Sequence, residues 1–122
     1  MAKSVLVVDD SASVRQVVGI ALKSAGYDVI EASDGKDALG KLNGQKVHLI
    51  ISDVNMPNMD GITFVKEVKK LASYKFTPII MLTTESQESK KQEGQAAGAK
   101  AWVVKPFQPA QMLAAVSKLI LP

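Results

Sequence analysis

Short apolar runs alternate along this chain with longer stretches whose apolar residues recur at helical spacing, and this alternation limits the possible folds most. Four of the runs are unbroken: Val5–Val8, Leu49–Ile51, Ile79–Leu82 and Trp102–Val104. Unbroken apolar runs are typical of strands that are covered on both faces. A weaker run, Tyr27–Ala32, carries Asp28 and Glu31 and is therefore predicted to form an edge strand.

The stretches between these runs predict helices. Three of them hold apolar residues at helical spacing: Val14, Val17, Val18, Ala21 and Ala25; Phe64, Val65, Val68 and Leu71; Met112, Val116, Leu119 and Ile120. Gly35–Leu42 and Ser86–Ala97 are less apolar and are also predicted to be helical. Five β-α units in series predict an α/β fold, a single doubly wound five-stranded parallel sheet with five helices. We expect one domain over residues 1–122, with no output domain.

Composition narrows the function. The chain has 122 residues and no cysteine, which excludes disulfides, thiol chemistry and cysteine-based zinc sites. No apolar run approaches the roughly 20 residues of a membrane helix, so we expect a cytoplasmic protein without membrane insertion. The net charge of +3 comes from scattered lysines with few aromatic residues among them. This pattern favours a solvated surface over nucleic-acid binding, and the surplus could also steer an acidic partner.

Polar residues stand where the predicted strands end. Asp9 and Asp10 follow the first strand and Asp53 follows the third, while Thr83 closes the fourth and Lys105 follows the fifth. Ligands of such sheets bind at the carboxyl ends of the strands. We therefore expect three carboxylates, a hydroxyl and an ammonium group to gather at one edge of the sheet.

This combination of groups suits phosphoryl chemistry. Carboxylates at ~4 Å repel one another by about 1–4 kcal/mol per pair, and a hard divalent cation relieves that repulsion. Mg²⁺ fits because it takes one or two carboxylates and leaves room for a phosphate oxygen. Asp53 could attack phosphorus and form an acyl phosphate. The metal and Lys105 would stabilise the charge on the transferred group, and Thr83 would donate a hydrogen bond to it.

Four motifs carry a resemblance to a known family. They are Val5–Ser11, Ile51–Gly61, Leu82–Thr83 and Val104–Phe107, in this order and each at a strand end. Together they resemble the response-regulator receiver family, and among its members the chemotaxis regulators most. The resemblance covers Ser4 to about Leu121 and implies a flavodoxin-like sheet with strand order 2-1-3-4-5.

The resemblance implies a phosphoacceptor and a metal site. Asp53 matches the phosphoacceptor, Asp10 the direct metal ligand and Asp9 the partner that binds the metal through water. The backbone carbonyl of Asn55 matches the third protein ligand. The implied cofactor is Mg²⁺, for which Mn²⁺ is a possible substitute.

The resemblance also implies a switch. Thr83 matches the switch hydroxyl and Lys105 the phosphate-binding lysine, and the peptide bond between Lys105 and Pro106 is commonly cis in relatives. The switch aromatic, usually Tyr or Phe, is Trp102 here, and a larger ring is expected to swing inward less readily. Mere packing of Trp102 on an edge strand is the equal alternative.

Three residues match positions that tune self-dephosphorylation. Asn55 and Glu85 match chemotaxis regulators with short-lived signals. Thr84 replaces the usual Ala or Gly, and its β-branched side chain is expected to restrict access to the acyl phosphate. The match of Asn55 and Glu85 and the restricted access at Thr84 have opposite effects on the lifetime of the acyl phosphate.

The expected function is a phosphorylated binding switch rather than a turnover enzyme. The resemblance implies a CheA-like histidine kinase as donor, a flagellar motor switch component as target, and a monomer. A phosphorelay intermediate would use the same site. Two other functions fit less well. A hydrolase of the haloacid dehalogenase type needs a second Asp where Asn55 stands, and in a flavodoxin-like cofactor carrier Asp9 and Asp10 would repel the flavin phosphate. Taken alone, Asp10 and Ser11 could simply cap a helix. His48 is expected to be a structural or a surface residue.

Overall fold

The structure, a computed structural model, describes residues 3–84, 88–105 and 107–120. Strands and helices alternate along them. The strands are β1 (Ser4–Val8), β2 (Asp28–Ala32), β3 (Leu49–Asp53), β4 (Ile79–Thr84) and β5 (Ala101–Lys105). The helices are α1 (Ala12–Ser24), α2 (Gly35–Lys41), α3 (Gly61–Lys69), α4 (Glu88–Ala97) and α5 (Pro109–Leu119). This order confirms the predicted α/β architecture.

All five strands are parallel and lie in the order β2-β1-β3-β4-β5. The order confirms the flavodoxin-like topology that the resemblance implied. It also places the run with Asp28 and Glu31 at a sheet edge, as predicted. The chain reverses its direction of winding between β1 and β3, so the carboxyl ends of these two strands flank the switch point of the sheet.

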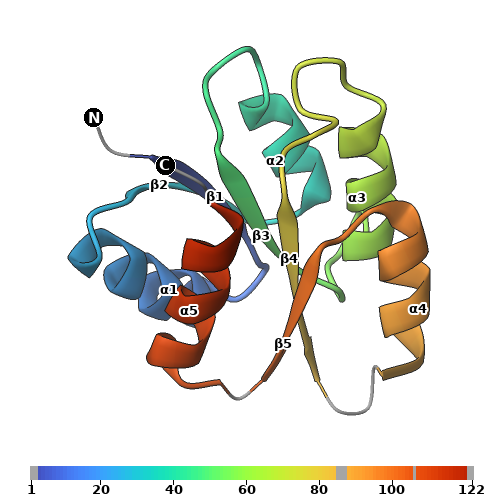
Figure 1. Cartoon of the computed structure of the whole chain (residues 1–122). Helices are drawn as coiled ribbons and strands as arrows, with labels where there is room; N and C mark the ends of the chain where they lie inside the picture. Colours follow the sequence, from blue (N-terminus) through green and yellow to red (C-terminus); the bar gives the residue numbers. More distant parts are fainter. Residues whose placement is uncertain (1–2, 85–87, 106, 121–122) are drawn as a thin grey trace.

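Helices cover both faces of the sheet, α1 and α5 on one and α2, α3 and α4 on the other (Figure 1). Successive strand residues point to opposite faces. Ile50 belongs to the core beneath α2, α3 and α4, whereas Ile51 belongs to the core beneath α1 and α5. Both are fully buried, which explains why the central strands read as unbroken apolar runs.

Side-chain caps fix three helix starts at the carboxyl edge of the sheet. Ser11, Asp34 and Asp60 each accept a hydrogen bond from the backbone N–H three residues later. Such caps satisfy N–H groups that have no partner within the helix. For the first helix, the cap is therefore Ser11.

The strands extend further than the apolar runs predicted. Asp53 is the last residue of β3 rather than the residue after it, because the ladder with β4 continues through Asp53 and Leu82. Likewise β4 runs one residue past Thr83, and Lys105 is the last residue of β5. Backbone pairing therefore sets the strand ends, whereas hydrophobicity predicted only the buried middle. Within the described ranges, none of the helices is long and apolar enough to cross a membrane.

Candidate functional site

The three predicted carboxylates lie together at the carboxyl edge of the sheet. Asp9, Asp10 and Asp53 each offer an oxygen, and these oxygens lie within 4.8 Å of one another. Asp9 is fully buried and Asp53 is 8% exposed, whereas Asp10 faces solvent. The three groups thus form an acidic cluster with two buried members and an open side at Asp10.

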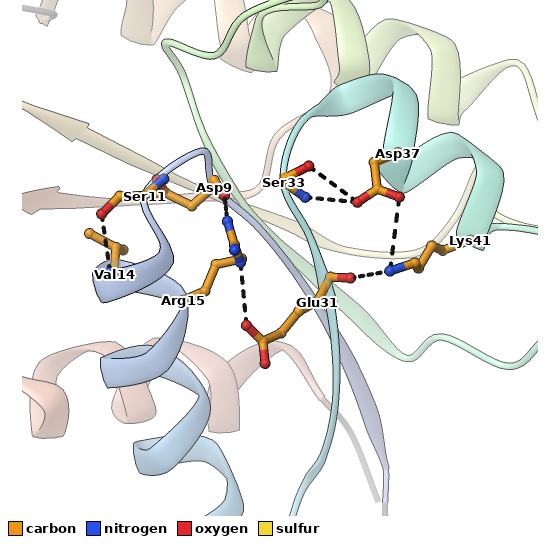
Figure 2. Close-up of polar contacts among 8 residues, drawn as sticks. All are labelled: Asp9, Ser11, Val14, Arg15, Glu31, Ser33, Asp37 and Lys41. Atoms are coloured by element: carbon orange, nitrogen blue, oxygen red, sulfur yellow. Dashed lines mark hydrogen bonds and ion pairs between the residues drawn. The ribbon is translucent and has the colours of Figure 1, made fainter.

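The backbone and side chain of Asp9 are fixed by its neighbours (Figure 2). Its Oδ1 accepts a hydrogen bond of 2.9 Å from the N–H of Ser11, and its carbonyl accepts one of 2.5 Å from Arg15. Arg15 also pairs with Glu31 on β2, at 3.3 Å. The role of Arg15 was not predicted, because helical spacing alone does not show that its side chain returns to the strand end.

The side chain of Lys105, at the end of β5, reaches the acidic cluster. Its Nζ lies 3.1 Å from Oδ2 of Asp9 and 3.3 Å from Oδ1 of Asp53. Burial would lower the pKa of Lys105, but the hydrogen bond to Asp9 and the charges of Asp53 and Asp9 outweigh it and raise the pKa. The ammonium group is therefore held in its charged form between two carboxylates.

The surroundings of Asp53, in contrast, disfavour its charged form. Burial raises its pKa, and the charge of Asp9 raises it further. Lys105 and the hydrogen bond of 2.8 Å from the N–H of Val54 to Oδ1 oppose this rise without cancelling it. The positive charge near Asp53 is therefore not enough to stabilise its ionised form fully.

The loop after β3 packs tightly against Asp53. A Cβ added to Gly61 would lie 2.0 Å from the carbonyl oxygen of Asp53, so glycine lets the start of α3 approach the strand end. Asn58 adopts a left-handed φ of 68° and donates a hydrogen bond of 2.8 Å to Asp34 at the start of α2. Asn tolerates this region better than most residues.

Asn55 and Thr84 line two different hollows. Asn55, two residues beyond β3, lines a polar hollow of about 160 Å³ with Lys66 and Glu93. Thr84 is paired in register with Lys105, and both line an apolar hollow of about 460 Å³ against Val17 of α1. The steric role of Thr84 and the metal-binding carbonyl of Asn55 both stay predictions.

The two predicted switch residues share one face of the sheet. Thr83 is 5% exposed and follows Met81 by two residues, and Met81 is paired in register with Trp102. Trp102 packs against the core beneath α3 and α4, where its buried Nε1–H has no hydrogen-bond partner among the described residues. Its ring lies so close to Gly94 of α4 that a Cβ there would be 2.1 Å from the Cη2 atom of Trp102.

Two predicted site residues, Glu85 and Pro106, lie outside the described residues. Their predicted roles, in dephosphorylation and in a cis peptide bond, therefore stay predictions. His48 lies far from the cluster and accepts a hydrogen bond of 3.0 Å from the N–H of Ser4. This contact agrees with the structural role expected for His48.

The donor set fits a hard divalent cation. The side-chain ligands are carboxylate oxygens alone, which suits Mg²⁺ better than a soft metal. Two of the three are buried beside each other, and a cation would offset both the burial of Asp53 and its repulsion from Asp9. The open side at Asp10 leaves room for waters and an anionic ligand.

Comparisons with known proteins agree with one another. The chain matches the family described as response regulator receiver domain over residues 5–117. The structure of chemotaxis protein CheY4 from Vibrio cholerae is 51% identical, has a TM-score of 0.92, and is matched over 98% of this chain and 99% of its own. The receiver domain of a sensor histidine kinase from Pseudomonas aeruginosa, with magnesium coordinated in its active site cleft, is 26% identical with a TM-score of 0.90, over 98% of each chain.

A curated relative is a longer protein. The alkaline phosphatase synthesis transcriptional regulatory protein PhoP of Bacillus subtilis is 39% identical over 98% of this chain and 49% of its own length. The chain spans about half the length of the curated relatives it matches.

Proposed function

The chain belongs to the response regulator receiver family, and we propose that it accepts a phosphoryl group onto Asp53 from the phosphohistidine of a histidine kinase. The observation that carries this proposal is the position of Lys105. Its ammonium lies 3.1 Å from Asp9 and 3.3 Å from Asp53, inside a cluster of three carboxylates. A cation held beside a buried nucleophile suits the transfer of a dianionic group.

The proposed reaction is an in-line displacement. A carboxylate oxygen of Asp53 forms a bond to phosphorus while the P–N bond of phosphohistidine breaks and the imidazole leaves with the electron pair. Lys105 donates hydrogen bonds to the phosphoryl oxygens, and Thr83 donates one from the neighbouring strand. Water later hydrolyses the acyl phosphate and regenerates Asp53, so the protein is a phosphoacceptor rather than a turnover enzyme.

The proposed cofactor is Mg²⁺, with Mn²⁺ as a substitute. Asp9, Asp10 and Asp53 would hold it, together with the backbone carbonyl of Asn55. When bound, the ion supplies positive charge against the transferred phosphoryl group. The magnesium in the receiver domain of the Pseudomonas aeruginosa kinase supports this assignment.

The proposed output is a phosphorylation-dependent contact with a target protein in chemotaxis. The likeness to CheY4 over nearly the whole of both chains supports it. A CheA-like kinase would be the donor and a flagellar motor switch component the target, in the cytoplasm, with the chain acting alone as a monomer. The likeness to PhoP covers half of that regulator, so its transcriptional activity is not transferred to this chain.

The test is an intact-mass measurement after incubation with acetyl phosphate and Mg²⁺. We expect one added phosphoryl group, sensitive to hydroxylamine, which is lost with a chelator and in Asp53→Asn. Lys105→Ala should still bind Mg²⁺ but accept the phosphoryl group at least about tenfold more slowly.

Two outcomes would contradict the proposal. One is a phosphoryl group on Asp53→Asn, which would place the acceptor elsewhere. The other is no adduct on the wild-type chain when either acetyl phosphate or a purified phosphorylated histidine kinase is the donor, under conditions that trap short-lived acyl phosphates.

A further inference from the structure

Two loops form a joined surface at the end of the sheet opposite the acidic cluster. They are residues 43–48, before β3, and residues 70–77, before β4, and together they are called the basic edge (Figure 1). Tyr74 joins them, since its hydroxyl donates a hydrogen bond of 2.7 Å to the carbonyl of Gln45 and accepts one of 3.0 Å from the N–H of Gly44. A hollow of about 340 Å³ lies between the loops.

The basic edge carries positive charge that no acidic residue of its own two loops neutralises. Neither loop contains Asp or Glu, and they contain Lys46, Lys70 and Lys75. Lys70 pairs with Glu67 of α3 at 2.9 Å. Lys46 and Lys75 are exposed and lie outside the helices, so the stabilisation of helix carboxyl termini by cations does not account for them.

Two titratable groups, one in the basic edge and one next to it, have pKa values lowered by nearby lysines. The pKa of His48, which lines the hollow, is lowered by partial burial and then by the charges of Lys3 and Lys46. The pKa of Lys69 is lowered by burial and then by the charge of Lys100. Lys69 is tied to the same surface by a hydrogen bond of 2.9 Å to the carbonyl of Thr77. Lys3 and Lys100 therefore add positive charge next to the basic edge.

An aromatic side chain projects from the rim of this surface. Phe76 is 87% exposed, and the Nζ of Lys75 lies 5.1 Å from the centre of its ring. A large apolar side chain left in water gains most when a partner covers it, and aromatic anchors of this kind dominate many protein interfaces. Neither the fold nor the phosphoryl site requires Phe76 to be exposed.

We propose that the basic edge binds an acidic segment of a partner protein. Carboxylates of the segment would lie beside Lys46 and Lys75, and an apolar side chain would cover Phe76. The surface is concave, so a side chain can fill it while a flat membrane cannot. A single-stranded nucleic acid needs several aromatic faces for stacking, but one face of Phe76 is covered by Lys75, and the two loops contain no Arg.

The test uses a short synthetic peptide of alternating Glu and Leu, titrated into the isotope-labelled full chain and followed by amide chemical shifts. We expect the largest shifts in residues 43–48 and 70–77. Lys46→Glu or Lys75→Glu should weaken binding about tenfold at low salt, and Phe76→Ala about fivefold. Lys36→Glu is the matched control, because Lys36 is an exposed lysine at the start of α2, and it should leave the affinity within about twofold.

The same variants separate this proposal from the proposed function. Lys46→Glu, Lys75→Glu and Phe76→Ala should accept a phosphoryl group from acetyl phosphate as the wild type does, because the basic edge and Asp53 lie at opposite ends of the sheet. The proposal is wrong if the peptide does not bind at millimolar concentration, or if Lys36→Glu weakens binding as much as Lys46→Glu. It is also wrong if a single-stranded oligonucleotide or a phosphatidylserine vesicle binds the same loops more tightly than the peptide.

Discussion

Single residues with no ionisable group decide where the acidic cluster lies. Gly61 is the clearest case, because its backbone presses against the carbonyl of Asp53 and its Cα lies beside the side chain of Met81. The φ angle of Gly61 is not in the left-handed region, so steric room rather than backbone freedom requires glycine there. Asp53 is thus positioned by a missing side chain as much as by its charged neighbours.

Gly61→Ala should destabilise the chain by about 1–3 kcal/mol, because the new Cβ overlaps backbone atoms that cannot move without displacing Asp53. Phosphorylation by acetyl phosphate should also slow. Gly40→Ala in α2 is the control: nothing lies within 4 Å of its Cβ position, and it should stabilise the chain by about 0.5–1 kcal/mol. Urea unfolding measures both changes. Equal stability changes in the two variants would show that the contact with Asp53 does not constrain position 61.

At the scale of elements, β5 and α4 pack closely because the ring of Trp102 lies against Gly94, which has no side chain. The indole ring occupies the space that any other side chain at position 94 would need. It does so although its Nε1–H is buried and, in the part of the chain that the structure describes, has no hydrogen-bond partner. A buried donor without a partner costs free energy, so good packing against α4 has to compensate for it.

A double-mutant cycle tests this match. Gly94→Ala should destabilise the chain by about 1–3 kcal/mol, because the Cβ would collide with the ring. Trp102→Phe should cost less than about 1.5 kcal/mol, since it removes the unsatisfied donor together with the contact. The double variant should recover at least about 1 kcal/mol relative to additivity. Trp102 is the chain's only tryptophan, so its fluorescence should shift to longer wavelength in Gly94→Ala. Strict additivity would mean that the two positions are not coupled.

The sequence predicted elements well where one local pattern suffices. Val5–Val8 and Ile79–Leu82 became strands because unbroken apolar runs reflect burial on both faces. The approach of Gly61 to Asp53, the return of Arg15 to Asp9 and the fit of Trp102 against Gly94 were not predicted. Each joins residues only six to eight positions apart, but across the junction between two elements, and no helical or strand periodicity encodes such a contact. The gathering of Asp9, Asp53 and Lys105 was predictable only because parallel strands place their ends at one edge.

For the molecule as a whole, the two ends of the sheet titrate with opposite effects on stability. At one end, burial and Asp9 raise the pKa of Asp53. The folded state then binds a proton more readily than the unfolded state, so this group adds stability as the pH falls. At the other end, partial burial and the charges of Lys3 and Lys46 lower the pKa of His48. The unfolded state then binds the proton first, so this group removes stability as the pH falls below about 6.5.

Stability measured by urea unfolding between neutral and mildly acidic pH, with a chelator present, should therefore show partial cancellation in the wild type. Asp53→Asn should raise stability at neutral pH by about 1 kcal/mol and leave a steeper loss on acidification, because the opposing contribution of Asp53 is gone while the lowered pKa values of His48 and Asp34 remain. His48→Asn should lower stability at neutral pH and lose less of it on acidification. The variant lacks Nδ1 of His48, which has to stay unprotonated to accept the hydrogen bond from Ser4. Mg²⁺ should stabilise the wild type and His48→Asn more than Asp53→Asn. If the pH profiles of both variants run parallel to that of the wild type, neither group controls the acid response.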